Sequence, residues 1–245
     1  MDSLGPARYA DLDFNAPLSC AHAQELIASL RPLEGASIVD LGCGWAEFLL
    51  RALEDEPTGH GVGVDRDPAV IARARTNAED RGVHDRVRLE CADATTWSEE
   101  TDVAIVVGAS HAWGGTRETL SAVARFLRPG GRFLLGEGIW EQPPTPEALA
   151  ALDARPDDFT TVPDLVELCL EFGYRLLALS TATLNEWDQF ESRYCAGRER
   201  WLLQNPDAPN AADVRTEIDD HRNGWLHGYR GILGFVYITL AAEAR

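Results

Sequence analysis

The sequence predicts an α/β protein built on a doubly wound, largely parallel sheet. From residue 37 onward, short β-branched runs alternate with helical segments, as expected where right-handed crossovers connect parallel strands. Glycines stand directly after the first run, and acidic residues stand where the next two runs end. In open α/β sheets, ligands bind at these carboxyl ends of the strands. The pattern therefore predicts both a fold and a place for a site.

Strands and helices follow one another at short intervals. The predicted strands are 37–41, 60–65, 87–91, 103–107, 132–136, 174–180 and 233–240, and the first predicted helices are 46–53, 68–81, 116–127 and 162–172. Asp67 followed by Pro68 is a typical helix start, because aspartate caps the first turn and proline fits its first position. Arg-Pro-Gly-Gly at 128–131 predicts a turn, and 142–146 a stiff proline-rich connector.

About fifty residues separate the last two predicted strands, and they are expected to form two helices divided by a turn at 205–210. Aromatic side chains recur on one face of the first of these helices, which favours packing. Because the segment leaves from a carboxyl end of the sheet, we also expect it to act as a lid. The predicted organisation is one domain over 1–245: a helical arm (1–34), a core (35–180), a helical insertion (181–231) and the last strand (232–245).

The composition limits the function classes. The 245 residues carry a formal net charge of −18, which disfavours nucleic acids and anionic membranes as partners. The chain has no lysine, so lysine-based covalent catalysis is excluded. Its five cysteines never stand at C-x-x-C spacing, so neither a disulfide framework nor a metal site is expected. No run reaches membrane-spanning length and no secretory signal is evident, so we expect a cytoplasmic protein, with a composition suggesting a bacterial source.

The residues best suited to bind a ligand follow the first three strands. Gly42 and Gly44 form the first strand-to-helix turn, where a missing Cβ lets the backbone approach a ligand. Asp65 ends the second strand, and its carboxylate can accept both ribose hydroxyls, each bond to a charged group contributing about 1.5–3 kcal/mol. Asp93, after the third strand, can accept from an adenine amine. Together they predict a nucleoside site.

A nicotinamide-dependent dehydrogenase is the first alternative. Its fingerprint requires a third glycine where this chain has Glu47, whose charge would face a diphosphate. A cofactor without phosphates, carrying a sulfonium and an ammonium group, suits Asp40 and Glu47 better. Electrostatics therefore favours the cationic cofactor.

These motifs resemble those of the class I S-adenosylmethionine-dependent methyltransferases. The matching segments are Val39–Gly44, Gly63–Asp65, Ala92–Ala94 and Leu127–Arg132, in the order and spacing of that family. Ala46 departs from the family, which often has glycine there. The resemblance implies a Rossmann-like sheet of seven strands with an antiparallel last strand, and S-adenosylmethionine as cofactor with S-adenosylhomocysteine as product. The cofactor-binding residues that we expect are Asp40, Gly42, Gly44, Asp65, Arg66, Ala92, Asp93, Ala94 and Gly108.

Catalytic residues are expected after the fourth and fifth strands, where the family places acceptor contacts. His111 has an ordinary pKa near 6.5 and can remove a proton from an acceptor, although it can equally be structural. Glu137 ends the fifth strand and can orient an amine or hydroxyl, or simply act as a capping acid. Residues expected to bind the acceptor are Tyr9, Asn15, Trp113, Trp140, Tyr194 and Tyr229. No metal is expected.

The predicted activity is methyl transfer to a nucleophilic O, N, S or C atom of a small molecule. A macromolecular acceptor is disfavoured by the acidity and by the lack of an appended recognition domain. Two alternatives stay open: an enzyme of the same fold that uses the sulfonium for cyclisation or elimination, and a non-catalytic protein that binds the cofactor. The sequence leaves open a monomer or a homodimer.

Overall fold

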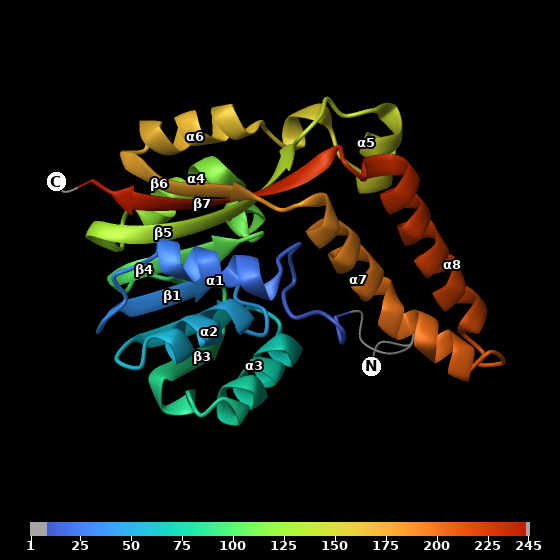
Figure 1. The fold of residues 1–245 in the computed structure, drawn as a ribbon, viewed down its shortest axis with the longest axis horizontal. Coiled ribbons are helices and arrows are strands. Elements are labelled where there is room, and N and C mark those ends of the chain that lie inside the picture. The colour runs from blue at the N-terminus through green and yellow to red at the C-terminus, as the bar shows by residue number, and fades with distance from the viewer. Residues whose placement is uncertain (1–8, 244–245) are drawn as a thin grey trace. The chain divides into compact units, whose positions relative to one another are not determined.

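The computed structural model describes residues 9–243, and its strands form one seven-stranded sheet in the order β3-β2-β1-β4-β5-β7-β6 (Figure 1). The strands are β1 (Ser37–Leu41), β2 (His60–Asp65), β3 (Val87–Cys91), β4 (Thr101–Val107), β5 (Leu127–Trp140), β6 (Tyr174–Thr181) and β7 (Leu233–Ala242). Neighbours from β3 to β5 run parallel, whereas β7 runs antiparallel to β6. This topology confirms the predicted Rossmann-like sheet with an antiparallel last strand.

The helices alternate with the strands as predicted. They are α1 (Cys20–Ser29), α2 (Glu47–Asp55), α3 (Pro68–Asp80), α4 (Thr116–Val123), α5 (Pro146–Leu152), α6 (Val162–Glu171), α7 (Leu184–Gln204) and α8 (Ala211–Asn223). The side chain of Asp67 accepts from the amide of Ala69, so the predicted cap of α3 is present. Helices α7 and α8 lie between β6 and β7, which confirms the predicted helical insertion.

The described residues divide into two compact units. We call residues 20–137, 162–181 and 236–243 the sheet unit, and residues 9–19, 138–161 and 182–235 the helical unit. The predictions of one domain over 1–245 and of a lid over 181–231 stay predictions. Residues 1–8 of the predicted helical arm lie outside the described residues, and α1 is the helix within the rest of that arm.

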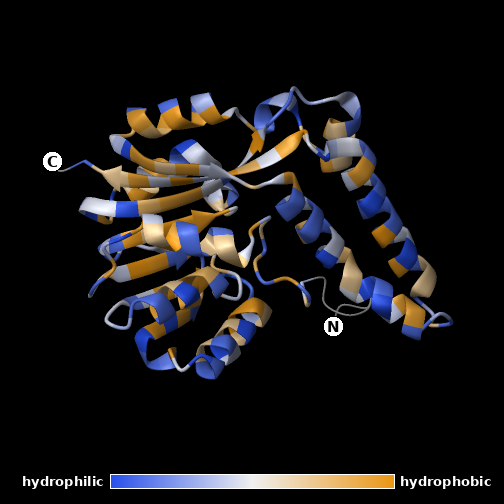
Figure 2. Cartoon of the chain, in the orientation of Figure 1, coloured by the Kyte–Doolittle hydropathy of each residue, from blue (hydrophilic) through white to orange (hydrophobic). Residues whose placement is uncertain are grey.

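The centre of the sheet unit is apolar because its middle strands are covered on both faces. β1 lies between β2 and β4, with Ile38 paired with both Gly61 and Val103. Central parallel strands of this kind are continuous apolar runs, and Figure 2 shows the hydrophobic residues along the sheet. Val39 and Leu41, further along β1, are completely buried. Burial and pairing on both sides therefore fix the position of the end of β1, where the following loop begins.

Several elements end or begin a few residues from the prediction, as where α4 ends at Val123 instead of 127, and two segments differ in kind. The predicted turn at 128–131 lies inside β5, because Leu127 already pairs with Thr101 and a register shift absorbs the extra residues. Within the predicted proline-rich connector, Thr145 accepts from the amide of Ala148 and Pro146 occupies the first helical turn, so α5 begins there. Both differences arise from pairing and capping that a local pattern of glycine and proline does not reveal.

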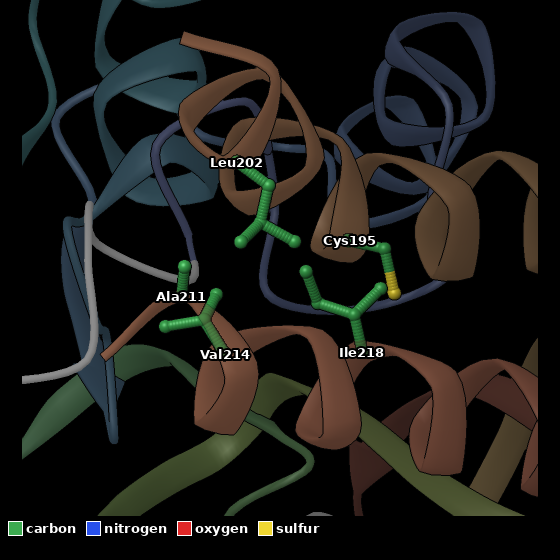
Figure 3. Packing of buried hydrophobic residues seen from close by; sticks show 5 residues of the cluster. All are labelled: Cys195, Leu202, Ala211, Val214 and Ile218. Carbon is green, nitrogen blue, oxygen red and sulfur yellow. The ribbon is translucent and has the colours of Figure 1, made fainter. Parts of the chain in front are cut away.

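The helical unit is built around α7 and α8, which lie side by side (Figure 1). α7 begins with a capping box in which Thr183 and Glu186 exchange hydrogen bonds with each other's backbone. The buried hydrophobic cluster between the two helices is shown in Figure 3 and comprises Cys195, Leu202, Ala211, Val214 and Ile218. Residues 9–19 contact α7 through two ion pairs: Asp13 pairs with Arg193 at 2.8 Å, and Asp11 pairs with Arg200.

Within residues 9–243, no helix combines the length and the apolar character that crossing a bilayer requires.

Two adjacent leucines of α7 allow a matched test of the helical cluster. Leu202 is 6% exposed and belongs to the cluster, whereas Leu203 is 82% exposed. We expect Leu202→Ala to lower the free energy of unfolding of the helical unit by about 2–5 kcal/mol, because it leaves a cavity. Leu203→Ala should change it by less than about 0.5 kcal/mol. Urea unfolding of both variants measures this, and equal effects would contradict the packing.

Candidate functional site

The loop after β1 is held between the ends of β2 and β4. The amides of Gly42 and Cys43 both donate to the carbonyl oxygen of Val64, at 2.8 and 3.0 Å. Gly42 has φ +81°, and a Cβ there would lie 2.4 Å from Cβ of Ala109. Gly44 has φ +54°, and a Cβ there would meet nothing within 4 Å. Gly42 is therefore required by packing, whereas Gly44 leaves its backbone open to a ligand.

Asp65 joins this loop to the one after β2. Its Oδ2 accepts from the amide of Gly44 at 2.9 Å, and its Oδ1 accepts from the amide of Asp67 at 2.9 Å. A carboxylate has about four acceptor positions, so each oxygen keeps capacity for another donor. Asp65 is half-buried and is thus both a structural link and an acceptor for a polyhydroxyl ligand.

Asp40 is the buried acid of this edge. It is 5% exposed, and burial, together with the nearby charge of Asp65, raises its pKa to about 8. At neutral pH its carboxyl group is therefore mainly protonated. A cation placed beside it would favour the ionised form, so Asp40 suits a positively charged ligand better than a phosphate.

The ends of β3 and β4 lie at the same edge of the sheet. The amide of Ala92 donates to the carbonyl oxygen of Asp65 at 3.0 Å, and the amide of Gly108 donates to that of Gly136 at 2.9 Å. Asp93 is exposed, and its Oδ1 accepts from the amide and the hydroxyl of Thr95, which lowers its pKa. Asp93 therefore acts as a helix cap here, with its second oxygen available to a ligand.

The two remaining predicted cofactor residues flank this edge. Ala94 is buried at the start of the 3₁₀ turn Ala94–Thr96, directly after Asp93. Arg66 is exposed, and its charge also lowers the pKa of Asp93. The structure thus brings all nine predicted cofactor residues to the carboxyl ends of β1 to β4.

Glu47 corrects one interpretation of the sequence. Its carboxylate is not directed at the glycine loop as a free charge, because it accepts from Arg51 at 2.6 Å and from Arg81 at 2.7 Å. These arginines offset its charge within α2 and at the end of α3. The preference of the loop for a cation over a diphosphate therefore depends on Asp40 and not on Glu47.

Glu137 is a second acid at this edge: it is half-buried and lies within β5, which continues beyond the end expected from the sequence to Trp140. Ser110 donates to its Oε2 at 3.0 Å, while its Oε1 is buried and has no hydrogen-bond partner among the described residues. Burial raises its pKa to about 7, and the hydroxyls of Ser110 and Thr116 offset part of this rise. A carboxyl group with a pKa near neutrality can both accept and donate a proton. The sequence singled out Glu137 but not Ser110, which only the meeting of the two strand ends reveals.

His111 and Trp113 lie on the 3₁₀ turn Ser110–Trp113, next to the hydroxyl that contacts Glu137. His111 is exposed and Trp113 is half-buried. The turn therefore presents an imidazole to solvent near Glu137.

The other five predicted acceptor residues belong to the helical unit. Tyr9 contacts Tyr194 edge-on with ring centroids 5.8 Å apart, and the hydroxyl of Tyr229 donates to Glu191 at 2.8 Å. The indole N–H of Trp140 donates to the carbonyl oxygen of Pro156 at 2.8 Å, and its ring packs on Phe159. Asn15 is exposed.

Sequence reasoning missed the buried partner of Tyr229. Glu191 is 3% exposed and contacts Nε2 of His221 at 2.6 Å as well as Tyr229. A glutamate in a helix is usually solvated, so only the apolar neighbours of its face on α7 signal that it is buried.

Over residues 9–243, no three His, Cys, Asp or Glu side chains are grouped so that they could hold a metal ion.

Known proteins share this sequence pattern and this architecture. A family model described as a methyltransferase domain matches residues 33–166. The chain is 36% identical over 218 residues to an uncharacterized protein, YjhP, of Escherichia coli, covering 87% of this chain and 88% of that one. It is 29% identical over 173 residues to trans-aconitate 2-methyltransferase of Variovorax paradoxus, covering 67% and 64%. The crystal structure of a methyltransferase dependent on S-adenosylmethionine, from Thiobacillus denitrificans in complex with S-adenosyl-L-homocysteine, is similar with a TM-score of 0.87, 31% identity and 96% coverage of each chain.

The two glycines of the loop predict different costs of substitution. Gly42→Ala and Gly44→Ala both place an alanine at positive φ, which costs about 1–2 kcal/mol. Gly42→Ala must also displace Ala109, and we expect it to lower the free energy of unfolding by about 1–3 kcal/mol more than Gly44→Ala. Denaturant unfolding of both variants measures the difference, and a more destabilised Gly44→Ala protein would contradict this loop geometry.

Proposed function

This chain belongs to the methyltransferases that depend on S-adenosylmethionine, and we propose that it transfers the methyl group to an O, N, S or C nucleophile of a small molecule. The observation that carries the proposal is the gathering of an open glycine loop, a half-buried acceptor carboxylate and a buried protonated acid at one sheet edge. A nucleoside that bears positive charges but no phosphate fits this set of groups.

The residues present fit the cofactor. Asp65 would hold the ribose hydroxyls with the acceptor positions that Gly44 and Asp67 leave unused. The open backbone at Gly44 and the buried Asp40 would hold the cationic methionine end. When bound, the cofactor supplies a methyl group activated by a sulfonium.

We propose for the remaining cofactor residues the roles that the family resemblance implies. Asp93 and Ala94 would hold the adenine, with Arg66 and Ala92 beside them, and Gly108 would flank the methionine part. The second oxygen of Asp93 supports its role, because the first is occupied by Thr95.

Two groups of the chain can take up the proton of an acceptor. Glu137 has a buried oxygen without a partner and a pKa of about 7, which suits proton transfer near neutral pH. His111 lies on the neighbouring turn and is exposed. Ser110 holds Glu137 through its other oxygen. We propose Glu137 and His111 as the catalytic residues, with Ser110 as a positioning residue.

A small-molecule acceptor is supported by the net charge of −18 and by the acceptor named for the relative from Variovorax paradoxus. The acceptor-binding roles of Tyr9, Asn15, Trp113, Trp140, Tyr194 and Tyr229 stay predictions. We also propose that the protein is bacterial and cytoplasmic and that it binds neither nucleic acid nor membrane.

Product analysis tests the activity. The protein is incubated with S-adenosylmethionine and a panel of small acceptors, and the nucleoside product is identified by mass spectrometry. Formation of S-adenosylhomocysteine with a methylated acceptor is expected. Methylthioadenosine as the product, or cofactor binding without turnover across the panel, would contradict methyl transfer.

Asp65 and Asp67 form a matched pair for cofactor binding. We expect Asp65→Asn to weaken binding of S-adenosylhomocysteine by about tenfold to a hundredfold, because charged hydrogen bonds to the ribose are lost. Asp67→Asn should leave affinity unchanged, because asparagine caps a helix as well as aspartate. Calorimetry measures both affinities and circular dichroism checks that each variant is folded. Unchanged affinity of Asp65→Asn would remove its assignment.

The raised pKa of Asp40 predicts how cofactor affinity depends on pH. In the free protein the carboxyl group stays protonated up to about pH 8, and a cationic ligand binds best to its ionised form. Affinity for S-adenosylhomocysteine should therefore rise with pH, by up to about tenfold per unit below pH 8, and then level off. Asp40→Asn should remove this rise. A wild-type affinity independent of pH would show that no cation binds beside Asp40.

A further inference from the structure

The helical unit contains a buried polar layer next to its hydrophobic cluster. Glu191 on α7 is hydrogen-bonded to Tyr229 and contacts His221 of α8 at 2.6 Å. The ring of His221 lies 4.5 Å from that of Tyr194, with an angle of 33° between the planes. Each oxygen of this acid thus has a partner within the helical unit.

Arg198 also contacts the ring of Tyr194. It is 3% exposed, and its guanidinium lies 5.0 Å from the centre of the Tyr194 ring. Nη1 donates to Glu217 at 3.2 Å. Its Nε and Nη2 are buried and have no hydrogen-bond partner among the described residues. A buried guanidinium with two unsatisfied N–H groups is costly, because it has lost water without gaining an acceptor.

The missing partners in this unit are all of one kind. Among its described residues, the buried side-chain nitrogen and oxygen atoms without a partner are Trp187 Nε1, Trp225 Nε1, and Nε and Nη2 of Arg198. Every one of them is a donor. These N–H groups lack an acceptor, and a ligand that carries oxygen atoms would supply one at Arg198.

We propose that the helical unit binds a small carboxylate through Arg198. The Nε–H and Nη2–H groups are adjacent on the planar guanidinium and match the two oxygens of a carboxylate in parallel bonds. Glu217 already offsets part of the positive charge, so one further negative charge is favoured over the two of a phosphate. The aromatic ring of Tyr194 provides an apolar wall beside the guanidinium.

A purely structural role for Arg198 predicts a different response to ligand. In either role, Arg198→Met keeps most of the side-chain volume but removes the ion pair with Glu217, so the stability of the free variant does not separate the two roles. Only a ligand site predicts that the variant loses a stabilisation by carboxylate that the wild type shows.

The inference extends the proposed function, since Tyr194 is one of the proposed acceptor-binding residues. Its test is made without cofactor, so its failure leaves methyl transfer untouched. Likewise, a failure to form S-adenosylhomocysteine would leave the carboxylate site standing.

Thermal unfolding of the whole protein with benzoate, succinate or inorganic phosphate tests the site. We expect at least one carboxylate to raise the melting temperature of the wild type and of Arg222→Met, a control whose arginine is paired with Glu199 and Asp219. Arg198→Met should lose that rise, and phosphate should give none. No carboxylate effect on the wild type, an equal effect on Arg198→Met, or a larger effect of phosphate would overturn the proposal.

Arg198→Lys provides a second measurement should the methionine variant fail to fold. It keeps the charge but lacks the planar fork, so calorimetry should show at least a tenfold weaker affinity for the carboxylate found above. Unchanged affinity would show that Arg198 does not bind the carboxylate through two parallel hydrogen bonds, and would overturn the proposal. Binding of S-adenosylhomocysteine by this variant should equal that of the wild type, which separates the two sites.

Discussion

The site depends above all on the carboxylate of Asp65. By accepting one backbone N–H from each of two loops, it fixes the position of Gly44 relative to the start of α3. The loop at Gly42 is fixed independently, by two amides on Val64 and by contact with Ala109. The open backbone is thus preorganised by neighbours on both sides, and little ordering remains to be done when a ligand arrives.

The sheet and much of its binding edge could be predicted from local properties of the sequence. These are the alternation of β-branched runs with helical segments and the place of glycines and acids after those runs. β1, β2 and β3 begin and end where the pattern of β-branched residues indicates. Glycines and acids at strand ends need only the rule that parallel strands present their carboxyl ends together. The bounds of β5 could not be predicted, because they depend on pairing with a strand some thirty residues away.

Partners of charged groups were the least predictable part. The sequence places Glu47 beside the glycine loop, but Glu47 forms an ion pair with Arg81, which directly follows α3. The same holds in the helical unit, where Glu191 and Arg198 look like solvated helix residues and are buried. Long-range ion pairs and burial come from tertiary packing, and no local pattern encodes which arginine meets which acid.

Asp40 gives the site an electrical property that an ionised acid would lack. The free protein keeps a proton on this buried carboxyl group at neutral pH, so this edge of the sheet holds no isolated negative charge in a poorly hydrated place. When a cationic ligand arrives, the proton can leave as the positive group enters. Loading is then an exchange of one cation for another, and the interior remains close to electroneutral before and after.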